Sequence, residues 1–183
     1  MAKPPTETRQ RIQDVARELF TQKGMQRTSL QDIADRLGIT KPALYYHFRS
    51  REDLLRSILQ PLIDDGETFV ASQESRRGAN RPAAREVLQG YLDFHYRHRA
   101  DLMLIISELT TLADLGLIDA LLAWRDRLGK VIFGRRPTLE QSVRSVIAFG
   151  GLQDCCVQFP DTPYDQLSRA AIDGAMAALG LPD

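Results

Sequence analysis

Cysteine is scarce in this sequence, and the two that occur, Cys155 and Cys156, are adjacent. Neighbouring side chains on one helix diverge, so this pair cannot form an ordinary disulfide, which suits a reducing compartment. Long apolar runs are also missing: no stretch reaches the roughly twenty residues of a membrane-spanning helix, and neither end carries a leader peptide or a lipidation signal. We therefore expect a soluble, cytoplasmic protein with no membrane partner.

The residue patterns of common active sites are missing as well. The sequence contains no HExxH zinc site, no glycine-rich phosphate loop and no nucleophile elbow. His95 and His98 have a spacing that can bind a metal, but no acidic or cysteine partner is evident in the sequence. Cys155 and Cys156 fit buried apolar packing, with a redox role as the alternative. The sequence predicts a protein that is not an enzyme and has no metal or cofactor.

Net charge is absent overall, but the charges are unevenly distributed. Residues 1–60 contain eleven Lys or Arg against seven Asp or Glu, whereas residues 61–183 contain thirteen against seventeen. A basic head on an acidic body is the distribution expected when only one end of a protein meets the phosphates of a nucleic acid.

Helical periodicity dominates the chain, and strand-like alternation is nearly absent. Apolar residues recur at helical spacing from Thr6 onwards, and glycine or proline separates the segments. The prediction is an all-α protein of about nine helices, with an arm at 1–5 and a loop at 75–81. Ser29, Thr40 and Ser50 are predicted to cap the second, third and fourth helices, and the fourth continues through Pro61. The later helices are expected near 82–98, 101–113, 117–133, 138–158 and 163–180.

The second and third predicted helices are short and have the spacing of a helix-turn-helix. Ala34 is small enough for two helices to cross closely, Gly38 can adopt the left-handed conformation of the turn, and Leu44 fills the angle between the helices. A helix held in this way projects its N-terminal end into the major groove of DNA. We expect residues 1–50 to form a DNA-binding domain and residues 51–183 to form a helical regulatory and dimerisation domain.

The run from Thr28 to Leu55 resembles the N-terminal DNA-binding domain of the TetR family, most specifically at Leu44–Phe48 (LYYHF). The resemblance covers about the first 58 residues, and the rest matches only in length and helical character. Arg51 replaces the family's usual lysine and keeps its charge. The resemblance implies a transcriptional repressor that a small-molecule ligand releases from a palindromic operator. The alternative is an interaction protein whose helix-turn-helix is a docking module without DNA binding.

The resemblance also implies which residues contact DNA. Lys41 is the expected base reader, and Pro42 and Ala43 offer apolar contacts. Tyr46 and His47 reach phosphates, with Thr28, Ser29 and Arg51 as additional phosphate clamps. Tyr45 could do either, and Phe48 is expected in the core. The full expected set is Thr28, Ser29, Thr40, Lys41, Pro42, Ala43, Tyr45, Tyr46, His47 and Arg51.

The body is expected to bind a ligand and a second copy of the chain. A small apolar or aromatic ligand would contact Tyr91, Phe94, His95, His98, Met103 and Trp124. The last two helices are expected to pair with their copies in a two-fold homodimer. The residues assigned to this interface are Val143, Ile147, Gly150, Gly151, Asp154, Leu167, Ala171, Gly174, Ala175 and Ala178. The alternative is that these stripes pack inside one subunit.

Overall fold

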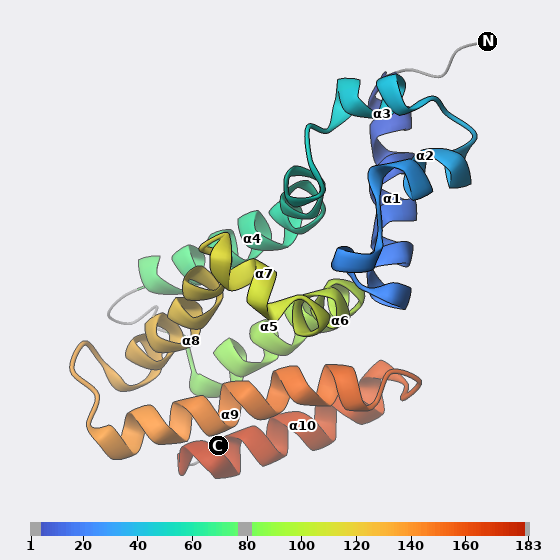
Figure 1. Cartoon of the computed structure of the whole chain (residues 1–183). Helices are drawn as coiled ribbons and strands as arrows, with labels where there is room; N and C mark the ends of the chain where they lie inside the picture. Colours follow the sequence, from blue (N-terminus) through green and yellow to red (C-terminus); the bar gives the residue numbers. More distant parts are fainter. Residues whose placement is uncertain (1–4, 77–81, 182–183) are drawn as a thin grey trace.

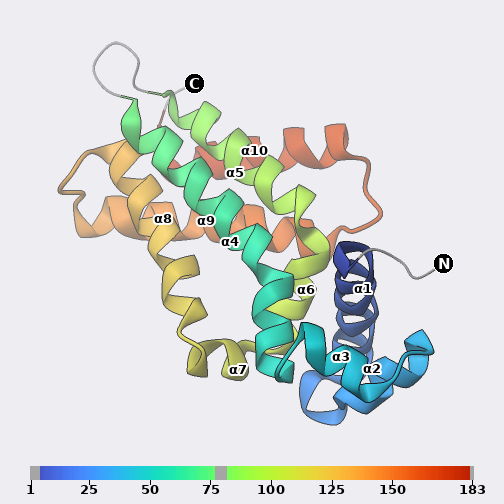
Figure 2. The ribbon, with the colours of Figure 1, turned by 90° about the horizontal axis from the view of Figure 1, so that it is seen from above.

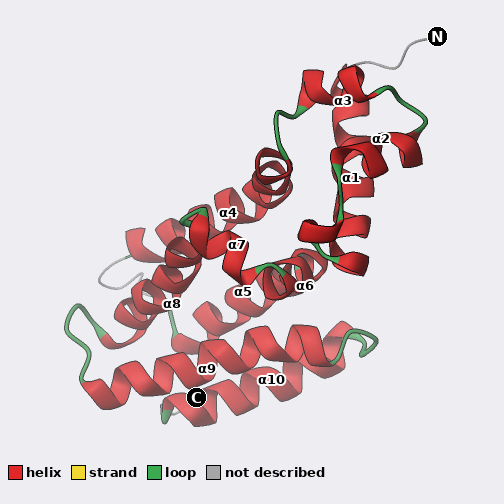
Figure 3. Ribbon diagram, in the orientation of Figure 1, coloured by secondary structure: helices red, strands yellow, loops and turns green. Residues whose placement is uncertain are grey.

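A computed structural model describes residues 5–76 and 82–181 (Figure 1). Ten α-helices and one 3₁₀ turn, η1, account for most of these residues, and no strand occurs among them (Figure 3). The all-α prediction is therefore confirmed. Residues 1–4 of the predicted arm and 77–81 of the predicted loop lie outside the described residues. The elements are α1 (Pro5–Lys23), η1 (Met25–Arg27), α2 (Leu30–Leu37), α3 (Lys41–His47), α4 (Arg51–Ser75), α5 (Ala84–Arg97), α6 (Arg99–Ser107), α7 (Leu109–Asp114), α8 (Leu117–Phe133), α9 (Leu139–Gln158) and α10 (Tyr164–Leu179).

The predicted caps of the head helices are present. The Ser29 hydroxyl accepts from the Asp32 amide while the Asp32 carboxylate accepts from the Ser29 amide, which completes a capping box. Thr40 and Ser50 cap α3 and α4 in the same manner through their hydroxyls. Gly38 ends α2 with φ +66°, a conformation that a side chain disfavours.

One feature of the middle of the chain differs from the prediction. The expected helix at 101–113 is two helices, α6 and α7, because the backbone at Glu108 leaves helical geometry with φ −120° and ψ 24°. The break lets the Glu108 side chain point inwards, where it is only 6% exposed. Apolar periodicity continues across the break, so the sequence gives no sign of it.

The helices form a head and a body joined by α4. Seen from above, α1, α2 and α3 gather at one end, and α4 runs from α3 into the body, where α9 and α10 lie side by side (Figure 2). One contiguous apolar core extends through both parts. The helices α4 and α8 cross at Gly66, where the Trp124 ring packs directly on the α4 backbone. A Cβ atom at position 66 would overlap this ring. None of the helices in the described ranges combines the length and hydropathy that crossing a bilayer requires.

Candidate nucleic-acid interface

The helix-turn-helix is held by a small, fully buried core. Ile33 and Ala34 of α2, Leu44 of α3 and Phe48 just after it are all 0% exposed. The predicted contact between the small Ala34 and the wedge residue Leu44 is therefore buried, and α3 cannot rotate without opening this core. The outer face of α3 has a fixed orientation as a consequence.

That outer face presents polar and aromatic side chains to solvent. Thr40, Lys41, Pro42 and Ala43 are exposed at the start of α3. Tyr46 is 81% exposed and Tyr45 is 45% exposed, and the Lys41 Nζ atom lies 5.8 Å from the centre of the Tyr45 ring. Two neighbouring exposed tyrosines beside a lysine give this face the character of a contact surface, because a tyrosine offers both apolar area and a hydroxyl.

The start of α2 adds to the same surface. Ser29 is exposed, and Asp32 holds its amide at 2.8 Å, an interaction that lowers the pKa of the Asp32 carboxyl. A hollow of about 310 Å³ lies between α2, α3 and the start of α4, and besides Ser29 and Lys41 it is lined by Gln31 and Arg49. Both of these side chains are exposed. The sequence interpretation missed them, although each lies within two residues of a predicted cap.

Two expected phosphate clamps do not have this role in the structure. Thr28 is 0% exposed, and its hydroxyl donates to the Gly24 carbonyl at 2.9 Å. Its side chain is thus used inside the head. Arg51 donates through one guanidinium nitrogen to the carbonyls of Met25, Gln26 and Thr28 at 3.0–3.3 Å. The charge at position 51 ties η1 to the start of α4, so the prediction of a free clamp there is corrected.

His47, at the end of α3, is half-buried and lies edge-on to Tyr46. Its carbonyl accepts from the Arg9 guanidinium of α1 at 2.9 Å, and the same guanidinium lies 4.2 Å from the centre of the Phe48 ring. Arg9 was not among the predicted site residues, because nothing in the sequence brings α1 next to the end of α3.

The helix-turn-helix segment is similar to a family of known proteins. Residues 12–58 match the family model described as bacterial regulatory proteins, tetR family. The likeness to this family is carried by residues 12–58, in the N-terminal part of the chain.

The curated relatives resemble the same part of the chain. The HTH-type transcriptional regulator AcrR of Shigella flexneri is 50% identical over 83 residues, covering 45% of this chain and 39% of the relative. The HTH-type transcriptional activator FasR of Mycolicibacterium smegmatis is 32% identical over 91 residues, covering 50% and 42%. The chain thus matches less than half the length of either relative.

Solved structures match the fold over nearly the whole chain. A transcriptional regulator from Aquifex aeolicus has a TM-score of 0.72 at 21% identity and covers 93% of this chain and 98% of its own. AmtR of Mycobacterium smegmatis has a TM-score of 0.74 at 22% identity, with 96% and 87% covered. These likenesses show that the helical body has the same fold as the bodies of such regulators.

The expected ligand residues form a packed aromatic cluster in the body. Tyr91, Phe94, His95 and Trp124 are each 3–4% exposed, and their ring centres lie 4.0–5.8 Å apart in successive pairs. A polar rim adjoins them, since Arg125 contacts the Tyr91 hydroxyl at 3.4 Å and the Gln153 side chain at 2.6 Å. The structure brings these four predicted residues together.

The other two predicted ligand residues lie elsewhere. Met103 is 45% exposed and therefore does not line this cluster, which corrects its assignment. His98 touches Phe94, but its ring nitrogens face the carboxylates of Asp65 at 3.0 Å and Asp101 at 3.6 Å. It bridges α4 and α6 at the edge of the cluster.

The expected dimer residues divide between two environments. Val143, Ile147, Gly151 and Asp154 are exposed on α9 and Gly150 is half-buried, whereas Leu167 and Ala175 of α10 are buried against the core of their own subunit. Ala171 and Ala178 also pack against this core, and only Gly174 faces solvent. The α10 stripe thus packs inside one subunit, as in the alternative interpretation.

The sequence interpretation missed three residues that extend the exposed apolar face of α9. Leu139, Val146 and Leu122 are 81%, 56% and 56% exposed.

The adjacent cysteines are partly or fully enclosed. Cys155 is half-buried and Cys156 is buried, and burial raises the pKa of the Cys156 thiol to about 11. A thiol that stays protonated at neutral pH is a poor nucleophile. This favours apolar packing over a redox role for Cys156.

Polar contacts tie the head to the body. The buried amide of Met25 in η1 donates to the Glu108 carboxylate at 2.6 Å, and the Thr111 hydroxyl donates to the same carboxylate at 3.3 Å. Arg17 of α1 pairs with Asp101 of α6 at 2.8 Å. The break between α6 and α7 therefore places the Glu108 carboxylate where it accepts from the Met25 amide, a backbone group that the head cannot pair by itself.

Replacing Glu108 with Ala is expected to destabilise the protein by about 1–3 kcal/mol, because it leaves the buried Met25 amide without an acceptor. Chemical denaturation measures the change. Glu108→Gln, which keeps one acceptor oxygen, should lose less, and Glu140→Ala on the surface of α9 is the control. Equal losses from Glu108→Ala and Glu140→Ala would contradict the role of this contact.

The stability of the body should depend on His95 between pH 6.5 and 4. Burial lowers the pKa of His95 from its ordinary 6.5 to about 4. The unfolded chain therefore binds a proton in this range that the folded protein excludes, so stability falls as the pH falls, by up to about 3 kcal/mol. His95→Gln should flatten this part of the pH profile in denaturation experiments. An unchanged slope in His95→Gln would contradict a buried neutral imidazole.

Proposed function

We propose that the protein is a transcriptional regulator whose head reads a palindromic DNA operator and whose body responds to a small molecule. The observation that carries the proposal is the exposed face of α3, with Lys41 and Tyr46 on a helix fixed by a fully buried core. A rigid helix with exposed polar side chains at its start suits the major groove. The head and body of this proposal are residues 1–50 and 51–183.

A docking module without DNA binding would need a different surface. Protein-docking faces are centred on a dry apolar patch, whereas this face carries Lys41 and Arg49 beside the polar start of α2. The relatives that match the head are named as transcriptional regulators. Both points support DNA binding. A gel-shift assay with the DNA upstream of the protein's own gene tests it, and no specific complex with that DNA or with a selected pool would favour docking.

A homodimer follows from the reach of one recognition helix. A single helix reads only a few base pairs, and a two-fold partner places a second copy one turn of DNA away, at about 34–36 Å. The exposed apolar face of α9, with Leu122 beside it, supports this surface as the interface. Large apolar side chains at this density on one helix are costly to leave in water. The proposed interface therefore centres on α9, with Gly174 of α10 at its side.

A small apolar or aromatic effector is proposed for the body. The cluster of Tyr91, Phe94, His95 and Trp124 offers apolar walls with a few polar groups at one edge, which is the usual composition of a ligand pocket. Solved structures with this fold include regulators named for fatty acids and a ketosteroid. Since the four rings are in contact, a ligand enters only if they separate. A thermal-shift screen of small hydrophobic compounds tests the proposal.

We propose repression as the direction of control, which the TetR resemblance implies. Relatives of the head include a protein named as a repressor and one named as an activator, so the direction belongs to each protein and its operator. A reporter gene behind the bound promoter distinguishes the two, because repression predicts higher expression when the protein is deleted.

Replacing Lys41 with Ala should weaken binding to the preferred DNA site by about 1–3 kcal/mol and relax the preference at one base pair. Tyr46→Phe should weaken all sequences alike, because it removes only a hydroxyl placed for phosphate. Binding isotherms on single-base variants of the site measure both effects. Arg97→Ala, an exposed charge on the body, is the control. An unchanged affinity and base preference in Lys41→Ala would remove Lys41 as the base reader.

Replacing Ile147 with Glu should convert the protein to monomers and abolish tight operator binding while the head stays folded. Ile147 is 57% exposed, so the charge costs little within one subunit but is desolvated in the dimer. Light scattering measures the mass, and circular dichroism the fold. Leu109→Glu is the matched control, since Leu109 is 51% exposed on α7. A dimeric Ile147→Glu protein would place the interface elsewhere.

A further inference from the structure

Pro61 lies in the middle of α4 and leaves one carbonyl of that helix without its usual donor. In an α-helix the amide of each residue donates to the carbonyl four residues earlier, and proline has no amide hydrogen. The helix nevertheless runs unbroken from Arg51 to Ser75. Pro61 has no amide hydrogen to donate to the carbonyl of Ser57. Ser57 lies in the part of α4 that is nearer to the head.

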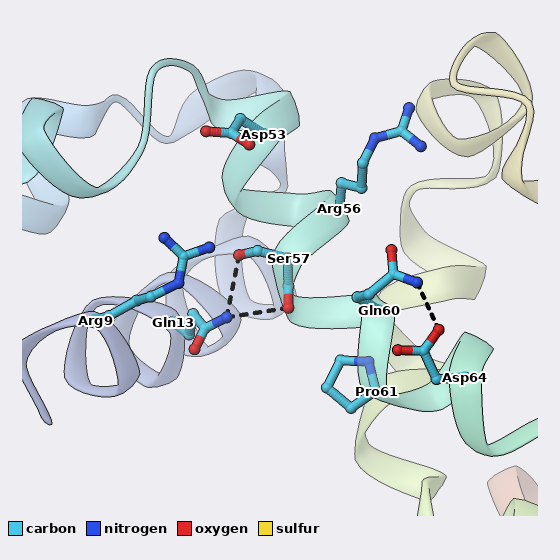
Figure 4. Close-up of a pocket in the computed structure, with 8 residues that line it drawn as sticks. All are labelled: Arg9, Gln13, Asp53, Arg56, Ser57, Gln60, Pro61 and Asp64. Atoms are coloured by element: carbon cyan, nitrogen blue, oxygen red, sulfur yellow. Dashed lines mark hydrogen bonds between the residues drawn. The ribbon is translucent and has the colours of Figure 1, made fainter. Parts of the chain in front are cut away.

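A side chain from α1 provides the missing donor. The Gln13 Nε2 atom donates to the Ser57 carbonyl at 3.0 Å and to the Ser57 hydroxyl at 3.1 Å (Figure 4). A primary amide carries two hydrogens, so it can serve both acceptors at once. The Ser57 hydroxyl in turn donates to the Leu54 carbonyl at 2.8 Å, which fixes it as an acceptor towards Gln13. All of these groups are partly buried.

The same face of α1 makes a second bond of this kind. Arg9 lies one helical turn before Gln13, and its guanidinium donates to the carbonyl of His47, the last residue of α3. Carbonyls in the last turn of a helix have no donor within the helix. Two side chains one turn apart on α1 therefore bind two carbonyls that the recognition helix and α4 cannot pair by themselves. Figure 4 shows Arg9 and Gln13 projecting from the same helix towards α4.

We propose that Gln13 is a positioning residue that fixes the angle of the DNA-binding head on α4, through the carbonyl that Pro61 leaves free. The importance of Gln13 then depends on the proline. With an ordinary residue at position 61, the helix itself supplies a donor to the Ser57 carbonyl, and the bond from α1 becomes redundant. This inference rests on the proposed function, because the angle of the head sets the separation of the two recognition helices in the dimer.

The test is a double-mutant cycle with Gln13→Ala, Pro61→Ala and the double variant. The probe is the double-stranded oligonucleotide that the wild-type protein enriches most strongly from a random pool, together with versions carrying one base pair more or fewer between the half-sites. Gln13→Ala should weaken binding to the parent oligonucleotide about threefold to tenfold, the worth of one hydrogen bond. It should also bind the altered spacings with less discrimination than the wild type does.

In the Pro61→Ala background the same change at Gln13 should alter affinity by less than about twofold. Gln13→Glu, which keeps the length but has no amide hydrogen, should behave like Gln13→Ala. Gln10→Ala is the matched control, since Gln10 lies on the same helix and, among the described residues, its side chain bonds to Asp14 one turn later in α1. A loss of affinity that is equal in both backgrounds, or unchanged discrimination between spacings, would overturn the positioning role.

Chemical denaturation of the wild type and the three variants without DNA tests whether Pro61 creates the dependence on Gln13, separately from DNA binding. The stability changes should be non-additive, with Gln13→Ala costing less when residue 61 is Ala. Additive changes would show that Pro61 does not create the dependence on Gln13 and would overturn the proposal. If the wild type enriches no DNA, the proposed function fails and the positioning role fails with it, whatever the cycle shows.

Discussion

Backbone groups that cannot be paired within their own helices decide how the head is held. The Met25 amide finds its acceptor on Glu108. The carbonyls of His47 and Ser57 are bound from α1. A buried backbone group without a partner costs more than a hydrogen bond gains, so the buried Met25–Glu108 contact is hard to remove. The apolar core keeps the head folded, and these hydrogen bonds fix its orientation relative to α4 and the body.

The same contacts involve several of the arginines that make the first sixty residues basic. Much of the positive charge in the first sixty residues is used within the protein. Arg9 and Arg51 donate to carbonyls, and Arg17 pairs with Asp101. Arg9 and Arg51 keep their charge but their guanidinium groups are held by these bonds, whereas Lys41 and Arg49 are exposed at the hollow between α2, α3 and α4. Arginine suits the internal role because its guanidinium reaches several acceptors at once.

Sequence reasoning predicted the parts of the structure that depend on neighbours in the chain. Ser29, Thr40 and Gly38 act within a few residues of themselves, and their caps and turn are as expected. Burial of Leu44 and Phe48 followed from the spacing of the helix-turn-helix. Local patterns of this kind require no knowledge of how distant segments meet.

The errors concern contacts between distant segments. Periodicity showed that Ala175 lies on an apolar face of α10, but not that this face is buried within its own subunit. Thr28 is a local exception: it had the right residue type for a phosphate contact, but it is buried and its hydroxyl donates to the carbonyl of Gly24 four residues earlier. Met103 was assigned by residue type alone. Glu108 was not singled out, because only the fold brings it to η1.

The close crossing of α4 and α8 gives the protein an intrinsic optical reporter. Trp124 is the only tryptophan in the chain, and it is buried against Gly66 with its indole N–H directed at Glu67, 3.3 Å away. Indole emission shifts with the polarity of its surroundings. The tryptophan fluorescence of the unlabelled protein therefore comes from one known place, where the aromatic cluster of the body meets α4, the helix that carries the head.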